Sequence, residues 1–326
     1  MRSVMLTGAT GFIGSHLAER LLREGFRLSL WVRRRNGLIA SLERAGAKVF
    51  LGDPRDDRVL AAALRGVDLV VHCAGTARAF DREGYFKTNV DLTRWILGSL
   101  QAPQKMVYIS SQAAAGPSGG DAPLDESVEP RPISHYGQSK LEAEEWVRRW
   151  GGANGSGYVI LRPSIVYGPR ERDLYNLFKW IRRGVLPCMG DGRQQISLVH
   201  VDDLVDAVMA VVESAPPGQT YFVTGGEHCS VKALGLTIRD ALGKGRLLHL
   251  DIPEWVFESL GRILDAVSLV TRAPALLSRQ KTLEMRQPAW LCSNRKIREA
   301  LGWEPRLSLR HGIEETVAWY VREKWL

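Results

Sequence analysis

Short apolar runs alternate with amphipathic helical patterns along the first half of the chain. Strands are predicted at Ser3–Leu6, Leu28–Val32, Lys48–Leu51, Val67–His72, Met106–Ser110 and Tyr158–Leu161. Apolar residues at helical spacing predict helices between them, at Ile13–Leu22, Leu38–Ala45, Arg58–Leu64, Tyr85–Leu100 and Tyr136–Trp150. This alternation predicts an α/β fold in which βαβ crossovers build a parallel sheet with helices on both faces. Ligands of such sheets bind beyond the carboxyl ends of the strands, and functional residues are expected there.

The pattern changes after about residue 168. Gly168-Pro169, Leu186-Pro187 and Gly190-Asp191-Gly192 predict loops. A helix at Asp202–Val212 and a strand at Gln219–Thr224 predict a return to the sheet, and the chain beyond Gly225 is mostly helical. An apolar stripe there fits a substrate lid, a dimer face or core packing, of which core packing is expected. It consists of Val256, Phe257, Leu260, Ile263, Leu264, Val267 and Val270.

Composition narrows the class of protein. The 326 residues are 45% apolar and 25% charged, which is typical of a globular chain and excludes a disordered or fibrous one. With no run of about 20 uncharged apolar residues, we expect no membrane span. The first residues show no signal-peptide pattern, and the four cysteines are scattered, so a reduced cytoplasmic protein is expected.

Charge and histidine spacing exclude two further classes of site. The net charge is +8, but the positive residues are spread along the chain and only Arg33-Arg34-Arg35 forms a cluster, so no nucleic-acid binding is expected. No two histidines are spaced for shared coordination, and no metal site is predicted. His200 with Asp202-Asp203 is interpreted as a strand end followed by a helix cap.

A glycine motif joins the first predicted strand to the first helix. Thr7-Gly8-Ala9-Thr10-Gly11-Phe12-Ile13-Gly14 has the spacing G-x-x-G-x-x-G. Glycines permit a tight turn and a close approach of the backbone to a pyrophosphate, and the helix amino terminus offers free N–H groups. The lysine of a P-loop is absent, so the motif predicts dinucleotide binding by Gly8, Thr10, Gly11, Phe12, Ile13 and Gly14 rather than ATP hydrolysis.

The residue after the second strand indicates which dinucleotide binds. A carboxylate there bonds the ribose 2′-hydroxyl of NAD and repels a 2′-phosphate. This chain instead has Arg33, whose guanidinium group suits a phosphate, so NADP(H) is favoured over NAD(H). Asp53, after the third strand, is placed to accept a hydrogen bond from the adenine amino group, although a turn-capping aspartate has the same pattern.

Three residues, Ser111, Tyr136 and Lys140, predict proton exchange coupled to hydride transfer. Ser111 follows a strand, and Tyr136 and Lys140 lie four residues apart, on one face of the predicted helix. An ammonium group next to a phenol favours the phenolate and lowers its pKa, as a positively charged nicotinamide would. Ser111 then holds the substrate oxygen while Tyr136 exchanges its proton and a hydride moves between the substrate carbon and the nicotinamide.

With these motifs, nearly the whole chain resembles the extended short-chain dehydrogenase/reductase family. The matching pieces are Thr7–Gly14, Gly52-Asp53, His72-Cys73-Ala74-Gly75, Thr88-Asn89-Val90, Ser110-Ser111, Tyr136–Lys140, Leu161-Arg162-Pro163, Tyr167-Gly168-Pro169 and His200-Val201-Asp202-Asp203. The resemblance implies a doubly wound Rossmann domain from residues 1–167 and 197–224. It implies a smaller, mostly helical substrate domain from residues 168–196 and 225–326.

The resemblance also implies roles for particular residues. Tyr136 is the acid/base, Lys140 supports it and binds the nicotinamide ribose, Ser111 orients the substrate, and Asn89 helps organise the site. Further cofactor contacts are implied at Ala74 and Gly75 and at the backbone of Pro163 and Ser164. Family dimers pack through the helix that contains Tyr136 and the preceding one, so a homodimer is possible.

Two departures from the sugar-nucleotide members of the family narrow the class of substrate. Those members carry an arginine after their Gly-Asp-Gly loop, where this chain has Gln195 or Ile196, although Arg193 lies nearby. Dehydratases place Asp-Glu beside the catalytic serine, where this chain has Gln112-Ala113. The carboxyl-terminal half is rich in large apolar residues, namely Trp255, Phe257, Leu260, Leu276, Leu277 and Trp290.

Three functions follow from these features. The favoured one is an NADP(H)-dependent oxidoreductase that interconverts a ketone and a secondary alcohol on an apolar small molecule, as in the 3β-hydroxysteroid dehydrogenase and dihydroflavonol reductase branch. A nucleotide-sugar epimerase that uses its cofactor transiently is the first alternative. A cofactor-binding scaffold without chemistry is the second.

Overall fold

A seven-stranded parallel sheet forms the centre of the larger part of the molecule. The computed structural model describes residues 2–53, 56–155, 157–271 and 278–326. The strand order is β10-β6-β5-β4-β1-β2-β3. The bounds are β1 Ser3–Thr7, β2 Arg27–Val32, β3 Lys48–Leu51, β4 Leu69–His72, β5 Lys105–Ile109, β6 Tyr158–Pro163 and β10 Gln219–Val223. All six neighbouring pairs are parallel, which confirms the doubly wound α/β fold.

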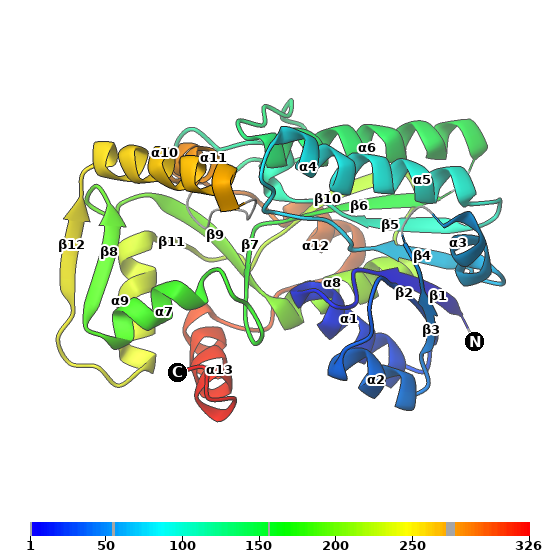
Figure 1. Cartoon of the computed structure of the whole chain (residues 1–326), viewed down its shortest axis with the longest axis horizontal. Coiled ribbons are helices and arrows are strands. Elements are labelled where there is room, and N and C mark those ends of the chain that lie inside the picture. The colour runs from blue at the N-terminus through cyan, green and yellow to red at the C-terminus, as the bar shows by residue number, and fades with distance from the viewer. Residues whose placement is uncertain (1, 54–55, 156, 272–277) are drawn as a thin grey trace.

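Helices cover both faces of this sheet (Figure 1). On one face lie α1 Phe12–Arg23, α2 Gly37–Arg44, α8 Val201–Ser214 and α12 Arg295–Leu301. On the other lie α3 Asp57–Leu64, α4 Arg82–Phe86, α5 Leu92–Ser99 and α6 His135–Asn154. Alternate residues of β1 serve the two layers, because Val4 and Leu6 pack with the first set and Met5 with the second. Each of these three side chains is fully buried.

The predicted helix Tyr85–Leu100 is interrupted. The structure has α4, then a π-helical turn at Lys87–Asp91, then α5. A π turn holds one extra residue, and such turns are frequent at functional sites. Here the turn contains Asn89, which is 1% exposed.

The second part of the molecule holds short strands that the sequence did not predict. One sheet has the order β11-β9-β13 with β7 beside β9, and a two-stranded sheet pairs β12 with β8. The bounds are β7 Ile165–Tyr167, β8 Val185–Met189, β9 Gln195–His200, β11 His228–Ser230, β12 Leu248–Ile252 and β13 Ala289–Trp290. The expected loop at Leu186-Pro187 is wrong, since both residues lie in β8. Proline is tolerated there because β8 pairs with one strand only.

The helices of this part are α7 Tyr175–Arg182, α9 Val231–Ala241, α10 Glu254–Thr271, α11 Arg279–Met285 and α13 Leu309–Arg322. Figure 1 shows α10 and α11 together at the outer surface of this part. The prediction that the chain beyond Gly225 is mostly helical is confirmed. The division into two domains by residue number remains a proposal.

The apolar stripe on α10 is buried only in part: Val256, Phe257 and Leu264 are half-buried. Leu260 is 43% exposed and Ile263 is 60% exposed, so the expectation of core packing is wrong for both. The helix packs on α11 at Gly261, which is four residues after Phe257 and three before Leu264, and a Cβ atom added there would lie 3.2 Å from Thr282 Oγ1. The side chains of Val267 and Val270, together with Leu276 and Leu277, lie outside the described residues.

None of the helices in the described ranges is both long enough and apolar enough to cross a membrane.

Candidate active site

The glycine motif forms a cradle at the amino end of α1. Gly8 has a φ of 78°, and a Cβ atom there would lie 2.7 Å from the Ala74 nitrogen. A Cβ atom at Gly14 would lie 2.1 Å from the Gly8 carbonyl oxygen. Both positions therefore require glycine. Gly11 caps α1 without a side-chain hydrogen bond, which leaves the helix amino terminus to other acceptors. These features fit the pyrophosphate of a dinucleotide.

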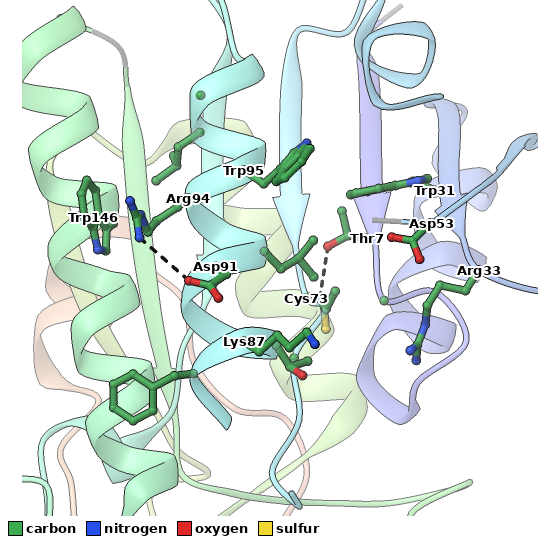
Figure 2. A pocket seen from close by; sticks show the side chains of 18 of the residues that line it. Thr7, Trp31, Arg33, Asp53, Cys73, Lys87, Asp91, Arg94, Trp95 and Trp146 are labelled. Atoms are coloured by element: carbon green, nitrogen blue, oxygen red, sulfur yellow. Dashed lines mark hydrogen bonds and ion pairs between the residues drawn. The ribbon is translucent and has the colours of Figure 1, made fainter. Parts of the chain in front are cut away.

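A groove of about 1560 Å³ runs from the carboxyl ends of β1, β2, β3 and β4 over α5 and α6, as far as Leu100 and Ala153. Of the predicted cofactor residues, it is lined by Gly8, Thr10, Gly11, Arg33, Asp53, Ala74 and Gly75. Figure 2 shows Arg33 and Asp53 on one side, Thr7 and Cys73 at the centre, and Trp146 on the opposite side. Phe12, Ile13 and Gly14 form the first turn of α1.

Only one residue of the arginine cluster both lines the groove and follows β2 directly. Arg33 is exposed and lies in the groove wall. Arg35 instead pairs with Glu43 of α2, with 2.8 Å between Nη2 and Oε1. That Arg33 contacts the adenosine end of the cofactor stays a prediction.

A buried polar chain that the sequence did not predict joins β1, β4 and α5. The Thr7 hydroxyl lies 2.7 Å from His72 Nδ1, and His72 Nε2 lies 2.9 Å from Thr93 Oγ1. Thr7 Oγ1 also accepts a hydrogen bond from the Ala74 nitrogen. Burial, with a smaller contribution from the Lys140 charge, lowers the pKa of His72 to about 3. The neutral His72 ring therefore holds the Thr7 side chain, and Thr7 in turn binds Ala74 in the loop that lines the groove.

Asn89 connects the loop after β4, through Thr76, to Ser139 of α6. Its Oδ1 accepts from the Thr76 nitrogen at 2.8 Å, and its Nδ2 donates to the Thr76 carbonyl and to Ser139 Oγ. A Cβ atom at Gly75 would lie 2.9 Å from Asn89 Oδ1 and 3.6 Å from Lys140 Nζ. The groove, Asn89 and Lys140 are thus neighbours, and Asn89 holds the site together.

Stability should fall in mild acid because two histidines are buried in the neutral form. The unfolded-state pKa is near 6.5, whereas burial lowers the folded-state pKa of His72 to about 3 and of His200 to about 4. Below pH 6.5 the unfolded state binds more protons, so the free energy of unfolding falls by up to about 1.4 kcal/mol per pH unit for each histidine. Urea unfolding at a series of pH values measures this slope. His72→Gln should lower this slope by the contribution of one histidine, and a slope equal to that of the wild type would contradict this explanation.

Ser111 follows β5, and Tyr136 and Lys140 lie one turn apart at the start of α6. The Ser111 side chain acts on the Tyr136 phenol and favours its ionised form. Lys140 is 5% exposed, and its Nζ donates to the Ile109 carbonyl at 2.6 Å and lies 4.5 Å from the centre of the Tyr108 ring. Burial lowers the pKa of Lys140 to about 8.

The expected lowering of the tyrosine pKa is not what the structure shows. Burial raises the pKa of Tyr136 to about 12, although the Ser111 side chain acts in the opposite direction. The reason is that desolvation of a phenolate outweighs its nearby favourable contacts. Tyr136 is therefore a phenol at neutral pH and suits the role of proton donor.

A buried ion pair fixes α6 behind these residues. Arg162 of β6 donates to both carboxylate oxygens of Glu144, at 2.9 and 2.7 Å, and the Ser110 hydroxyl donates to the same carboxylate. Burial alone would raise the pKa of Glu144, but the Arg162 guanidinium holds it below its usual value. Ser110 thus has a structural partner, whereas Ser111 contacts Tyr136. The Leu161-Arg162-Pro163 motif was a signal for this pair, but its partner Glu144 was not identified.

Pro163 and Ser164 lie at the end of β6. The Ser164 nitrogen donates to the Val223 carbonyl at 3.0 Å. Its buried hydroxyl has no hydrogen-bond partner among the described residues. An unpaired buried hydroxyl at the carboxyl end of a central strand fits a position that contacts a polar ligand group.

His200 itself caps α8. Its ring Nδ1 accepts from the Asp202 nitrogen at 3.3 Å, so the capping residue is the histidine and not the expected aspartate. Asp203 instead accepts from the nitrogens of Arg306 and Leu307. Potential ligand atoms of His200, Asp202 and Glu315 lie within 4.8 Å of one another, and the predicted absence of a metal remains a prediction.

Comparisons with known proteins agree with this geometry. The model of the NAD dependent epimerase/dehydratase family matches residues 4–224. A ceramide reductase from Caulobacter vibrioides is 28% identical over 99% of this chain and 96% of its own length. A 3 beta-hydroxysteroid dehydrogenase/Delta 5-->4-isomerase from Mycobacterium tuberculosis is 27% identical over 98% of this chain and 90% of its own length. The solved UDP-glucuronic acid 4-epimerase from Bacillus cereus, in complex with UDP-glucuronic acid and NAD, has a TM-score of 0.81 and 23% identity, covering 98% of this chain and 99% of its own.

The chain therefore belongs to the NAD dependent epimerase/dehydratase family, because the family model covers more than half of it. The resemblance to extended short-chain dehydrogenases/reductases is confirmed, and the protein is an enzyme of this NAD(P)-dependent superfamily.

Proposed function

We propose that the protein is an NADP(H)-dependent oxidoreductase that interconverts a ketone and a secondary alcohol on an apolar substrate. The observation that carries the proposal is that Ser111 acts on the Tyr136 phenol at the end of β5, with the buried Lys140 one turn further along α6. This group lies at the same sheet edge as the glycine cradle, to which Gly75 connects it. A protonated phenol and a second hydroxyl are the groups that ketone reduction requires.

The residues have separate tasks in reduction. Ser111 holds the substrate oxygen, Tyr136 donates its proton to that oxygen, and Lys140 binds the nicotinamide ribose. Asn89 keeps the β4 loop in place, and the backbone of Pro163 and Ser164 meets the nicotinamide amide. When bound, NADPH supplies the hydride that reduces the carbonyl carbon, and Tyr136 regains a proton from solvent after each turnover.

The exposed position of Arg193 favours an apolar substrate over a sugar nucleotide, because this arginine is not held in a site where it would bind a pyrophosphate. Its side chain is 87% exposed and pairs with Asp191 at 2.9 Å. Ile196, at the expected arginine position, is buried in β9. A relative named ceramide reductase supports this assignment.

Cofactor preference is tested by substitution of Arg33. Because a guanidinium–phosphate contact is charge-assisted, we expect Arg33→Ala to weaken NADPH binding by about 10- to 100-fold and to leave NADH binding nearly unchanged. Fluorescence titration with both cofactors measures this. Arg35→Ala is the matched control, because Arg35 pairs with Glu43 and should leave both affinities as they are. Equal NADPH affinity in the two variants would contradict the assignment.

The epimerase remains the second candidate, because the matching family model includes such enzymes. An epimerase returns its cofactor to the starting oxidation state, so it shows no net consumption of NADPH. A scaffold without chemistry would show neither activity.

We also infer a cytoplasmic enzyme that forms homodimers through α5 and α6. All four cysteines are free, which supports a reducing compartment. Light scattering of the purified protein tests the dimer, and a monomer at micromolar concentration would contradict it.

A further inference from the structure

Helix α11 is attached to the first turn of the helix that carries Tyr136. The Ser134 hydroxyl donates to Glu284 Oε1 at 2.7 Å, and the His135 nitrogen donates to Gln280 Oε1 at 2.8 Å. Ser134 is also the cap of α6, since its Oγ accepts from the Gly137 nitrogen. Segments about 150 residues apart in the chain thus meet directly beside Tyr136.

The Glu284 carboxylate is held on the inner side of α11. Its side chain is 15% exposed, and its Oε2 lies 3.1 Å from Nζ of Lys281, which is 57% exposed. The Trp290 indole donates to the Glu284 backbone carbonyl at 2.8 Å. A negative charge is therefore fixed near the Tyr136 phenol, while its cationic partner extends into solvent.

This charge acts on Tyr136 in the same direction as burial does. Both raise the tyrosine pKa, because each disfavours the phenolate. Tyr85 of α4, whose ring centre lies 6.3 Å from that of Tyr136, also has a raised pKa, with burial as the main cause and Glu284 as a further one. The other side chains that act on Tyr136 are those of Cys73, Tyr108 and Ser111. Arg286, which caps the end of α11, pairs with Glu254 and Glu258 of α10.

We propose that Glu284 is a positioning residue for the reaction at Tyr136: its carboxylate fastens α11 to the start of α6 and places a negative charge beside the phenol. The proposal rests on the proposed function, in which Tyr136 donates the proton. It makes α11 part of the reducing site, although it is far from the glycine motif and from Tyr136 in the sequence. The charge retains the proton on Tyr136 at alkaline pH, and the two hydrogen bonds fix the wall of the site.

The two effects are separated by substitution. Glu284→Gln removes the charge but keeps an oxygen that accepts from Ser134. Gln280→Ala removes the second hydrogen bond and keeps the charge. Glu258→Gln on α10 is the matched control, because it makes the same chemical change at a carboxylate paired with Arg286.

The experiment measures kcat/KM for ketone reduction against pH at saturating NADPH. We expect the pH at which the rate falls to move down by about half a unit in Glu284→Gln, which is the effect of losing one nearby charge. Gln280→Ala should raise KM without moving this pH, and Glu258→Gln should change neither quantity. A pH profile of Glu284→Gln that coincides with that of Glu258→Gln would overturn the proposal.

A second readout does not need turnover. The ultraviolet absorbance of tyrosinate gives the ionisation of Tyr136 when the titration of Tyr136→Phe is subtracted. The Tyr136 midpoint should be lower in Glu284→Gln than in the wild type, and equal midpoints would overturn the proposal. Absence of NADPH turnover in the wild type would contradict the proposed function alone, because this titration still reports the effect of Glu284.

Discussion

Tyr136→Phe is expected to lower kcat for ketone reduction by about 10²- to 10⁴-fold, the range that a positioned general acid contributes. Phenylalanine keeps the ring and removes only the hydroxyl that Ser111 contacts. NADPH binding should change little, because the glycine cradle and Arg33 are untouched. Single-turnover absorbance of NADPH together with a fluorescence titration measures both quantities on the same sample.

Tyr85→Phe is the matched control for this prediction. The Tyr85 ring lies beside that of Tyr136, and the substitution is chemically identical. We expect a loss of less than about 10-fold, because Tyr85 transfers no proton. If the two variants lost activity equally, Tyr136 would not be the acid.

Gly14→Ala is expected to abolish nucleotide binding, with at least a 100-fold weaker affinity for NADPH. The added Cβ atom would lie 2.1 Å from the Gly8 oxygen and 2.6 Å from the Gly8 carbon. Both contacts are with backbone, so the loop itself must move and the cradle is lost. We also expect destabilisation by about 1–3 kcal/mol, as for other overpacked positions. Titration with NADPH and urea unfolding measure the two effects.

Gly37→Ala provides the control for an added methyl group. Gly37 opens α2, and its Cβ atom would meet nothing within 4 Å. Alanine is the better helix former, so we expect unchanged affinity and stability that is equal or slightly greater. Normal NADPH binding by Gly14→Ala would show that the cradle does not hold the cofactor.

The sequence predicted those parts of the site that depend on local spacing. The glycine motif is local, and Tyr136 and Lys140 are both on α6, as their four-residue separation implied. Strand alternation predicted the seven strands of the parallel sheet because each is an apolar run with its own helix.

The sequence could not predict contacts between distant segments. His72 meets Thr7 and Thr93 only after three elements have packed, and no local pattern marks such a chain. The π turn that contains Asn89 has the same apolar periodicity as an ordinary helix. The tyrosine pKa was expected to fall because charge pairing can be inferred from spacing, whereas burial depends on the folded surroundings.

In the second part of the molecule, too, the local sequence could not predict the strands and the surroundings of the helices. Strand β8 contains Pro187, which predicted a loop, and β12 has the mixed sequence Leu248-His249-Leu250-Asp251-Ile252, so neither has the pattern of a central strand. The stripe on α10 has the periodicity of a core helix, yet Ile263 is exposed. Periodicity identifies an apolar face but not what covers it.

The most direct test of the account is the stoichiometry of NADPH consumption with an apolar ketone. Purified protein is incubated with NADPH and a panel of long-chain and ring-containing ketones, and NADPH loss is compared with alcohol formed. We predict one alcohol per NADPH oxidised for at least one member of the panel. Interconversion of UDP-hexoses with no net loss of cofactor, and no reduction of any ketone, would contradict the account.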